Sequence, residues 1–331
     1  MDKPGYGRFM RMIMGFRESK ILLAANDLDL FTRLDRGVCS VEELSAQMKV
    51  DAHALGILMD ALTAMGILSK NGATYDNREM TRTYLVKGSP HYQGQFLSFL
   101  NYCYRQLSTL EERLMPAGTG KSLPFVSGDE SRFARVYAWG MDNVAKERAE
   151  RIARHLDLAD AEKILDLGGG AATYSMAFAS MNPRLTAVVL DLPPTLEIAR
   201  ENIKLNGLCH RIRFLAGSYW DLDYGSGYDL VWISQVIHSL DEFQGRELIR
   251  RGAEALAPGG RLIVHDSLLA EDRASPYYAA MFSVFMLALT QGGRCHTVNE
   301  TRDWLIKAGL QDVCHFAFDS ESDLLIGRKP G

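Results

Sequence analysis

The spacing of hydrophobic positions differs between the two halves of the chain. In the first half, apolar side chains recur every three or four residues, as they do on one face of an amphipathic helix. Helices are expected over residues 7–34, and a capping box at 40–43 and a capping acid at Asp51 begin two more. A hairpin with its turn at Asn71 and Gly72 follows. Helices, turn and hairpin in this order predict a winged helix.

From Lys163 onward, short apolar runs alternate with helical segments. The expected strands cover residues 163–166, 185–191, 212–215, 228–234 and 260–266, and the helices between them cover 173–181, 194–206 and 241–256. This alternation predicts an α/β fold with a doubly wound parallel sheet. Further helices at 276–290 and 300–308 and two strands at 313–318 and 323–326 are expected to complete it.

Two domains follow from these patterns. We expect a mostly helical winged-helix domain over residues 1–95, and linker helices with the α/β domain over residues 96–331. A winged helix that binds DNA carries Lys and Arg on the exposed side of its second helix. Residues 51–66 contain neither, so we interpret the first domain as a packing and dimerisation module.

Charge and cysteine content agree with this interpretation. The formal net charge of −4 argues against nucleic acid as a partner. No apolar run approaches the length of a bilayer span, and the first residues do not resemble a signal peptide. Five scattered cysteines without a C-x-x-C pair indicate reduced thiols rather than a disulfide or zinc framework. We therefore expect a cytoplasmic protein without a metal site or a membrane partner.

A glycine-rich turn follows the first expected strand of the second domain. Gly168 and Gly170 fit the first two glycines of a dinucleotide turn, but Thr173 holds the position of the third. The alternative is the acid-x-G-x-G turn that binds S-adenosylmethionine (SAM). The Asp166 carboxylate before the turn suits the ammonium group of SAM and would repel a pyrophosphate. Asp191 ends the next strand, where a carboxylate can accept both ribose hydroxyls.

Several further stretches resemble those of class I SAM-dependent methyltransferases. They are D-L-G-G-G at 166–170, L-D-L-P-P at 190–194, G-S-Y-W at 217–220, V-I-H-S-L-D-E at 236–242, L-A-P-G-G-R-L-I-V at 256–264 and G-G-R at 292–294. With the winged helix, the whole chain resembles the small-molecule O-methyltransferases. These include plant caffeate-type, acetylserotonin and bacterial polyketide enzymes. The resemblance implies a homodimer formed through the N-terminal domain, with SAM as cofactor and S-adenosylhomocysteine (SAH) as product.

The resemblance also implies a catalytic base. The family histidine that follows the fourth strand falls at His238, and the first of the two acids that flank it falls at Asp266. A phenol with a pKa of about 10 needs a base at neutral pH, and histidine titrates in the right range. The second acid of the family pattern is replaced by Cys295. His265 should point to the opposite face of its strand and is given no role.

The cofactor site implied by the family departs from the usual residues at three positions. Ala172 stands where glycine is usual, Ser218 where an aspartate accepts from the adenine amino group, and Ser234 where plant enzymes have lysine. The full expected cofactor set is Asp166, Gly168, Gly170, Asp191, Leu192, Ser218, Tyr219, Trp220 and Ser234. Ser218 can still accept a hydrogen bond, without the charge-assisted part of about 1 kcal/mol.

The acceptor pocket implied by the family is lined with aromatic and methionine side chains. Its expected members are Phe133, Tyr137, Met141, Phe282, Phe285, Met286 and Thr290. Phe133, Tyr137 and Met141 recur every four residues, which also fits ordinary core packing. Aromatic rings and methionines clamp a flat ring and adapt to its shape. A phenol, quinol or polyketide-like ring therefore fits better than a highly anionic acceptor.

These observations together predict a SAM-dependent O-methyltransferase acting on a small aromatic or polyketide-like hydroxyl. Two alternatives keep SAM: a relative with non-methylating chemistry such as hydroxylation, decarboxylation or a pericyclic reaction, and a C-methyltransferase. The missing acid at Cys295 favours the first of these. A third alternative, a winged-helix regulator that senses an adenosyl ligand, is disfavoured because basic residues are lacking on the second helix.

Overall fold

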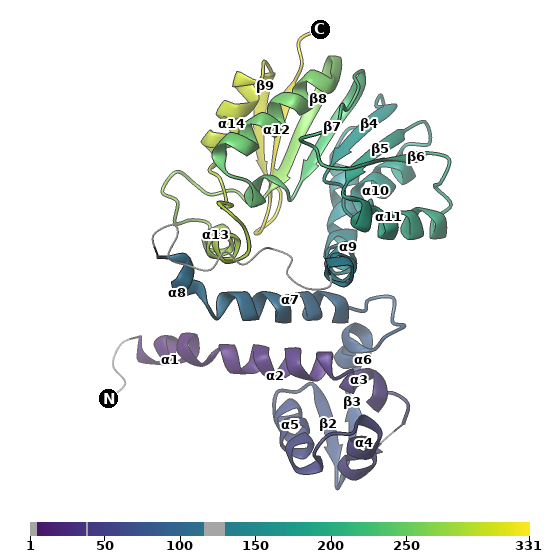
Figure 1. Cartoon of the computed structure of the whole chain (residues 1–331), viewed down its shortest axis with the longest axis vertical. Helices are drawn as coiled ribbons and strands as arrows, with labels where there is room; N and C mark the ends of the chain where they lie inside the picture. The colour runs from purple at the N-terminus through teal and green to yellow at the C-terminus, as the bar shows by residue number, and fades with distance from the viewer. Residues whose placement is uncertain (1–4, 38, 116–129) are drawn as a thin grey trace. The chain divides into compact units, whose positions relative to one another are not determined.

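The computed structural model describes residues 5–37, 39–115 and 130–331, with the side chains of 130–134 and 136 left out. Two compact units are formed by residues 1–105 and 106–331 (Figure 1). The boundary expected after residue 95 stays a prediction. No described helix is long and apolar enough to cross a membrane.

The N-terminal unit is a bundle of helices around a small sheet. Its helices are α1 (Tyr6–Met14), α2 (Phe16–Asp27), α3 (Leu30–Leu34), α4 (Val41–Met48), α5 (Ala52–Ala64), α6 (Glu79–Leu85) and most of α7 (Gly94–Leu107). Its strands β1 (Cys39–Ser40), β2 (Leu68–Asn71) and β3 (Thr74–Asn77) pair antiparallel in the order β1-β3-β2. The predicted hairpin is confirmed, and β1 is an addition that the sequence pattern did not indicate.

Both predicted caps in this unit are confirmed. The Ser40 side chain accepts from the Glu43 N–H while the Glu43 carboxylate accepts from the Ser40 N–H, which closes the capping box of α4. The Asp51 side chain accepts from the Ala54 N–H and begins α5. Behind these caps, Leu44 and Met59 are completely buried in the core of the unit. Helices α4 and α5 therefore begin where the sequence predicted.

The C-terminal unit is built on one sheet with the strand order β6-β5-β4-β7-β8-β10-β9. The strands are β4 (Lys163–Leu167), β5 (Thr186–Asp191), β6 (Ile212–Ala216), β7 (Tyr228–Ser234), β8 (Leu256–Asp266), β9 (Gln311–Ala317) and β10 (Asp323–Arg328). β4 to β8 are parallel, whereas β10 is antiparallel to both β8 and β9. The chain runs from β4 to β5 and β6 on one side and then crosses back to β7 on the other side of β4. A ligand crevice is expected at the carboxyl ends of the strands where this direction reverses.

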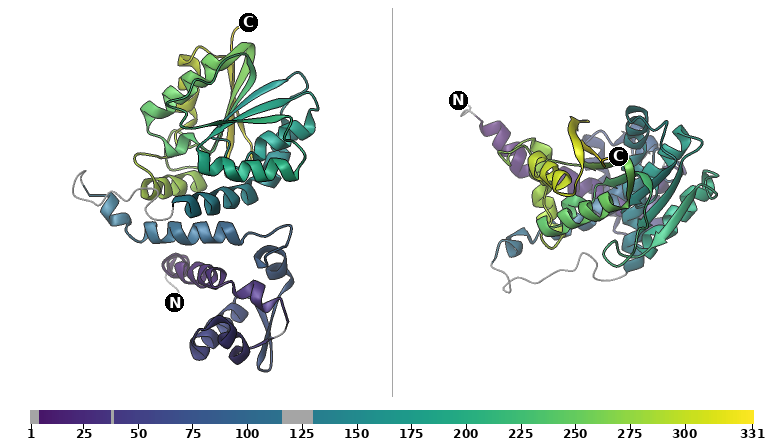
Figure 2. Two further views of the ribbon diagram at one scale, coloured as in Figure 1. Left: turned by 45° about the vertical axis from the view of Figure 1, so that its right-hand side comes forward. Right: turned by 90° about the horizontal axis from the view of Figure 1, so that it is seen from above.

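Helices cover both faces of this sheet, whose twist is visible in Figure 2. One core joins residues of α9 (Glu130–His155), α10 (Thr173–Met181) and α11 (Pro193–Leu205) to one face of the strands. A second core joins α12 (Glu242–Ala255) and α14 (Val298–Lys307) to the other face. The expected α/β architecture with helices on both faces is confirmed.

One expected boundary is wrong. The sequence predicted that the fifth strand begins at residue 260, but β8 is already paired at Leu256, which lies opposite Tyr228. Gly259 has φ +76°, and the register shifts between Tyr228 and Leu230. A glycine-rich segment can therefore continue a strand as a bulge instead of ending it. The carboxyl end of β8 at Asp266 is unaffected.

Candidate active site

The glycine turn after β4 combines left-handed backbone with two close approaches to neighbouring side chains. Gly168 and Gly170 have φ values of +72° and +58°, in the left-handed region that favours glycine. A Cβ at Gly168 would lie 2.7 Å from Cγ2 of Val236. A Cβ at Gly169 would lie 2.7 Å from Cγ of Asp166. Sequence reasoning missed Gly169, whose missing side chain makes room for the Asp166 carboxylate under the turn.

Ala172 adopts a backbone conformation that is typical of glycine. Its φ of +64° is left-handed, and it is the N-cap residue of α10. An L-residue has a steric penalty of about 1 kcal/mol or more in this region. The alanine is thus compatible with a left-handed turn at a small cost in stability.

Asp166 is buried beneath this turn and has one side-chain partner. It is 1% exposed, and its Oδ2 accepts a hydrogen bond from Oγ of Ser175 at 2.6 Å. Burial raises the pKa of Asp166 to about 7, and the negative charge of Asp191 adds to the effect, although Ser175 opposes it. A positively charged group placed beside Asp166 would therefore be bound more tightly by the ionised carboxylate than by the protonated carboxyl group.

Asp191 joins the end of β5 to the glycine turn. Its Oδ2 accepts from the Gly170 N–H at 2.8 Å and its Oδ1 accepts from the Leu192 N–H at 2.7 Å. Burial raises the pKa of Asp191, and these two N–H donors oppose the rise. The Thr195 side chain also hydrogen-bonds this carboxylate and opposes the rise. Since a carboxylate has about four lone-pair sites, a site remains for a further donor such as a ribose hydroxyl.

The residues after β6 form the next wall of the site. Oγ of Ser218 accepts from the Trp220 N–H at 3.1 Å, and the rings of Tyr219 and Trp220 meet edge to face with centroids 4.7 Å apart. Arg251 of α12 donates to the carbonyl oxygens of Tyr219, Trp220 and Leu222. Sequence reasoning missed Arg251 because these acceptors are backbone atoms about thirty residues away.

Ser234, at the end of β7, is held by a buried histidine. Its Oγ lies 2.8 Å from Nδ1 of His265, which occupies the paired position on β8 and is completely buried. Burial lowers the pKa of His265 to about 3, so the ring stays neutral. His265 thus orients the Ser234 hydroxyl, a contact that the sequence analysis did not assign.

His238 and Asp266 are brought together at the carboxyl ends of β7 and β8. His238 lies in the short 3₁₀ segment η1 (Ile237–Ser239), and its Nδ1 is 2.6 Å from Oδ1 of Asp266. Asp266 also accepts from the Ser267 N–H at 2.8 Å. Burial opposes ionisation of Asp266, but the facing imidazole and these hydrogen bonds lower the pKa of Asp266 below its usual value. The acid is therefore ionised and fixes the ring.

Cys295 does not replace the charge of the acid expected there. Its side chain is completely buried, and burial raises the pKa of Cys295 to about 12, so the thiol is neutral. Its backbone N–H donates to Oγ of Ser283 at 3.1 Å. It packs in a small cluster with Leu269 and Ala279, against which Phe282 also packs. Asp266 is thus the carboxylate on which the His238 ring depends.

The expected acceptor residues are placed on two helices. On α13 (Tyr277–Leu289), the Phe282 ring meets the His238 ring edge to face at 4.8 Å between centroids. It also stacks near Tyr278 at 5.8 Å and Phe285 at 5.9 Å. Further members of the expected set are Met286, buried on α13, Thr290, half-buried at its C-cap, and Tyr137 and Met141, both half-buried on α9. The Phe133 side chain lies outside the described residues.

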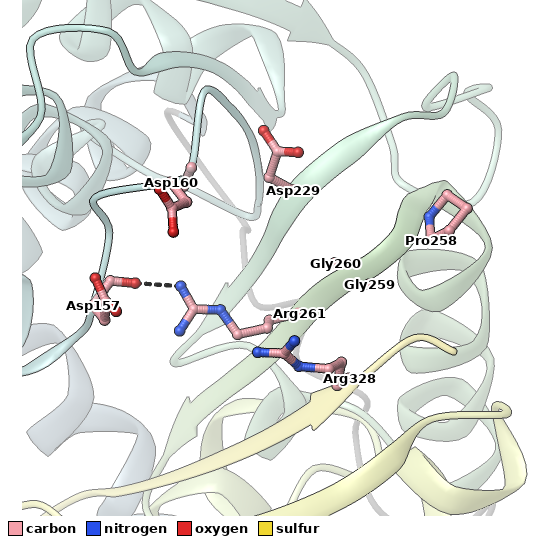
Figure 3. A pocket seen from close by; sticks show the side chains of 9 residues that line it. Asp157, Asp160, Asp229, Pro258, Gly259, Gly260, Arg261 and Arg328 are labelled. Carbon is pink, nitrogen blue, oxygen red and sulfur yellow. Dashed lines mark hydrogen bonds between the residues drawn. The ribbon is translucent and has the colours of Figure 1, made fainter. Parts of the chain in front are cut away.

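A cavity of about 270 Å³ lies at the opposite end of the sheet (Figure 3). Charged groups of both signs line it, and Arg261 of β8 donates to the carbonyl oxygen of Asp157 there. Asp157 and Asp160 precede β4, whereas the glycine turn follows it. This cavity is therefore separate from the candidate active site and lacks the aromatic lining expected for the acceptor. Among the described residues, no cluster of His, Cys, Asp and Glu could hold a metal ion.

Comparison with known proteins assigns both units. Residues 108–311 match the model of the O-methyltransferase domain, and residues 10–87 match that of the O-methyltransferase dimerisation domain. The chain is 29% identical to the 3-hydroxy-5-methyl-1-naphthoate 3-O-methyltransferase of Streptomyces sahachiroi, covering 92% of this chain and 90% of that protein. It is 26% identical to the L-tyrosine C(3)-methyltransferase of Streptomyces lavendulae, covering 90% and 85% respectively.

A solved structure supports the same fold. Human N-acetylserotonin methyltransferase in complex with SAM matches with a TM-score of 0.86 at 23% identity, covering 100% of this chain and 99% of that one. The chain therefore belongs to the O-methyltransferase family that combines a catalytic domain with a dimerisation domain. It is a SAM-dependent methyltransferase, as the sequence predicted, and the dimerisation domain points to a homodimer.

Proposed function

We propose that this enzyme transfers the methyl group of SAM to a hydroxyl of a small aromatic or polyketide-like acceptor, with His238 as general base. The observation that carries the proposal is the 2.6 Å contact between Nδ1 of His238 and the buried Asp266 carboxylate. An ionised carboxylate accepts the Nδ1 proton and leaves Nε2 as the basic nitrogen of the ring. This is the arrangement that a general base for a phenol requires.

The residues around the glycine turn fit the cofactor. Asp191, at the end of β5, can accept from the ribose hydroxyls, and Asp166 can pair with the ammonium group. Ser218, Tyr219, Trp220 and the exposed Leu192 side chain are available for the adenine. Bound SAM supplies a methyl group activated by the sulfonium. The protein then has to orient the acceptor, exclude water and remove the proton from its hydroxyl.

The acceptor class is inferred from the aromatic surroundings of the base. Phe282 touches the His238 ring, and Tyr278 and Phe285 extend this stack. A flat ring can continue such a stack while its hydroxyl points to Nε2 of His238. The relative from Streptomyces sahachiroi acts on a hydroxyl of a naphthoate, which is also a flat ring system. We propose that Tyr137 and Met141 of α9 close the other side of the pocket.

C-methylation is the second candidate, and one observation favours it. The chain is similar to an L-tyrosine C(3)-methyltransferase, a relative that methylates a carbon atom. A base that ionises a phenol activates the neighbouring ring carbons as well as the oxygen, so His238 fits both reactions. Non-methylating chemistry remains the third candidate, because the neutral Cys295 thiol leaves the site with one carboxylate beside the base.

Methyl transfer from isotopically labelled SAM to a panel of phenols, naphthols and hydroxyquinones tests the proposal. We expect label in an ether methyl group, recognised by its chemical shift in the ¹³C spectrum of the product. Label in a methyl group attached to a ring carbon would establish the C-methylating alternative. SAM binding without label transfer to any acceptor would favour the non-methylating one. Because no metal is invoked, a chelator should leave the rate unchanged.

The dimer is proposed to form through the N-terminal unit. Tyr6, Phe9, Met12 and Ile13 of α1 are all more than 40% exposed, which is unusual for side chains of this size in a monomer. We propose that a second copy covers them. Light scattering at micromolar concentration should give twice the mass of the chain, and a monomer would contradict the proposal. A cytoplasmic location stays a prediction.

Cofactor binding should depend on pH through Asp166. Because the pKa of Asp166 is raised to about 7 in the free protein, the carboxyl group must lose its proton before it can pair with the ammonium group. Affinity for SAH should therefore fall by up to about tenfold per pH unit below about pH 7 and level off above it. Calorimetric titration of SAH across this range measures the effect.

Two variants isolate this effect from other titrating groups. Asp166→Asn should bind SAH more weakly above neutral pH and lose most of the pH dependence. Ser175→Ala removes the hydrogen bond that opposes protonation, so its affinity should begin to fall at a higher pH than in the wild type. If the wild-type affinity is the same at about pH 6 and about pH 8, Asp166 does not carry the proposed contact.

A further inference from the structure

A second histidine, His296, holds the turn that carries His238. Its Nε2 lies 3.0 Å from the carbonyl oxygen of Ile237 and 3.2 Å from that of Leu240. These two carbonyl groups lie immediately before and two residues after His238. Since a carbonyl oxygen can only accept, Nε2 of His296 carries the proton and donates to both. One imidazole thus bridges the two ends of the 3₁₀ segment.

The ring of His296 is buried and packs against another ring. The side chain is completely buried, and its ring meets the Trp304 ring of α14 at 4.7 Å between centroids. Nδ1 is buried without a hydrogen-bond partner among the described residues. Burial lowers the pKa of His296, and the nearby Arg294 charge adds to this, so the ring is neutral. A neutral ring with its proton on Nε2 is the form that the two carbonyl groups require.

The backbone around His296 is tied to the strand that carries Asp266. The carbonyl oxygen of His296 accepts from the Leu269 N–H at 2.9 Å, and the carbonyl oxygen of Leu269 accepts from the Val298 N–H at 3.0 Å. Leu269 lies three residues beyond Asp266, at the end of β8. A Cβ at Gly293 would lie 2.6 Å from the carbonyl oxygen of His238. The segment 293–296 therefore packs directly on the backbone of the proposed base.

We propose that His296 is a positioning residue that fixes the direction of the His238 imidazole through the carbonyl groups of Ile237 and Leu240. Asp266 holds the ring of His238, and His296 holds its backbone, so the two contacts together set where Nε2 points. A misplacement of a reacting group by about 1 Å can lower a rate by about 100-fold. The inference rests on the proposed role of His238 as base.

Three variants separate the donated hydrogen bond from packing. His296→Phe keeps a ring against Trp304 but has no donor, whereas His296→Gln places an N–H at a similar reach. We expect kcat to fall by about tenfold or more in the Phe variant, with KM for SAM within about twofold, and to recover to within about threefold in the Gln variant. If the Phe variant does not fold, His296→Asn, whose amide is too short to reach both carbonyl groups, replaces it.

Hydrogen–deuterium exchange gives a readout that needs no catalysis. The amides of Ser239 and Leu240 donate to the carbonyl groups of Val236 and Ile237 at 3.0 Å and 3.1 Å. Their exchange should become about fivefold faster or more in the Phe variant and stay near the wild-type rate in the Gln variant. Equal exchange and equal kcat in all variants would overturn the proposal. So would the same loss in the Phe and Gln variants, which indicates packing alone. If the wild type transfers no methyl group but exchange changes as expected, the proposed function fails, whereas the role of His296 in holding the turn at 237–240 is supported.

Discussion

Replacing His238 by alanine should lower kcat for methyl transfer to a phenol by about 10³-fold at neutral pH, because positioned general bases contribute about 10²- to 10⁴-fold. The physical reason is that the acceptor keeps its proton: a phenol with a pKa of about 10 is almost entirely neutral at pH 7. Binding of SAM should change little, since no cofactor contact is assigned to His238. Initial rates at saturating SAM, together with calorimetric titration of SAH, measure the two quantities.

The pH dependence of the residual rate tests the role more sharply than its size. Without a base, the variant depends on spontaneous ionisation of the acceptor, so its rate should rise about tenfold per pH unit up to the pKa of the phenol. The wild-type rate should level off at a lower pH. His210→Ala, which removes an exposed histidine beside a loop, should behave as the wild type. Turnover by His238→Ala equal to the wild type at neutral pH would show that another group takes the proton.

Asp266→Asn tests the pair of His238 and Asp266 from the side of the acid. The amide keeps the size of the carboxylate, but it has one acceptor oxygen instead of two and no negative charge to stabilise the protonated ring of His238. Asp266 is 1% exposed and makes a further hydrogen bond to the Ser267 N–H, so its environment is built for an acceptor. A loss nearly as large as that of His238→Ala, without an added loss in the double variant, would show that the two residues act as a unit.

The elements that position the site could be predicted because their signals are local. Each signal spans only a few neighbouring residues. This holds for the glycine turn, for the acids at the ends of β4 and β5, and for the caps of α4 and α5. The structure places Asp166 beneath the glycine turn, next to Gly169, and Asp191 accepts from the Gly170 N–H of the turn. Alternation of apolar runs with helical segments was sufficient for the α/β sheet, since each run needs a partner strand to bury it.

The supporting contacts could not be predicted because they join distant segments through backbone atoms. Arg251 binds three carbonyl groups about thirty residues earlier, and His296 binds two about fifty-five to sixty residues earlier. Every residue has a carbonyl group, so the sequence does not indicate which of them accepts the hydrogen bond. His265 was correctly placed away from Asp266, but its contact with Ser234 depends on the register of β7 against β8.

The departures from the family pattern have unequal consequences in the structure. Ala172 adopts the left-handed backbone that is typical of glycine, so the alanine is compatible with the turn. Ser234 has a hydroxyl where plant enzymes have a charge, and His265 fixes its direction. Cys295 is different, because its neutral thiol leaves Asp266 as the charged partner of the base. The sequence marked all three positions as departures, but their effects could be ordered only from burial and backbone geometry.

Replacing Asp191 by alanine should abolish cofactor binding at ordinary concentrations. The carboxylate is proposed to accept both ribose hydroxyls, and hydrogen bonds to a charged group contribute about 1.5–3 kcal/mol each. Loss of two should weaken the affinity for SAM and SAH by about 100-fold or more. The variant also loses the contact to the Gly170 N–H, so the glycine turn should become less ordered. Calorimetric titration with both ligands measures the change.

Asp229→Ala is the matched control for the structural part of this effect. Its Oδ2 accepts from the N–H groups of Glu162 and Lys163, both at 2.9 Å, where β4 begins. Like Asp191, it holds two backbone amides beside β4, but at the end of the sheet away from the glycine turn. We therefore expect both variants to lower the melting temperature, while Asp229→Ala binds SAH with nearly wild-type affinity. If Asp191→Ala also retains that affinity, the ribose contact is wrong and the adenosyl group must be bound by other residues, of which the Ser218–Trp220 wall is the first to test.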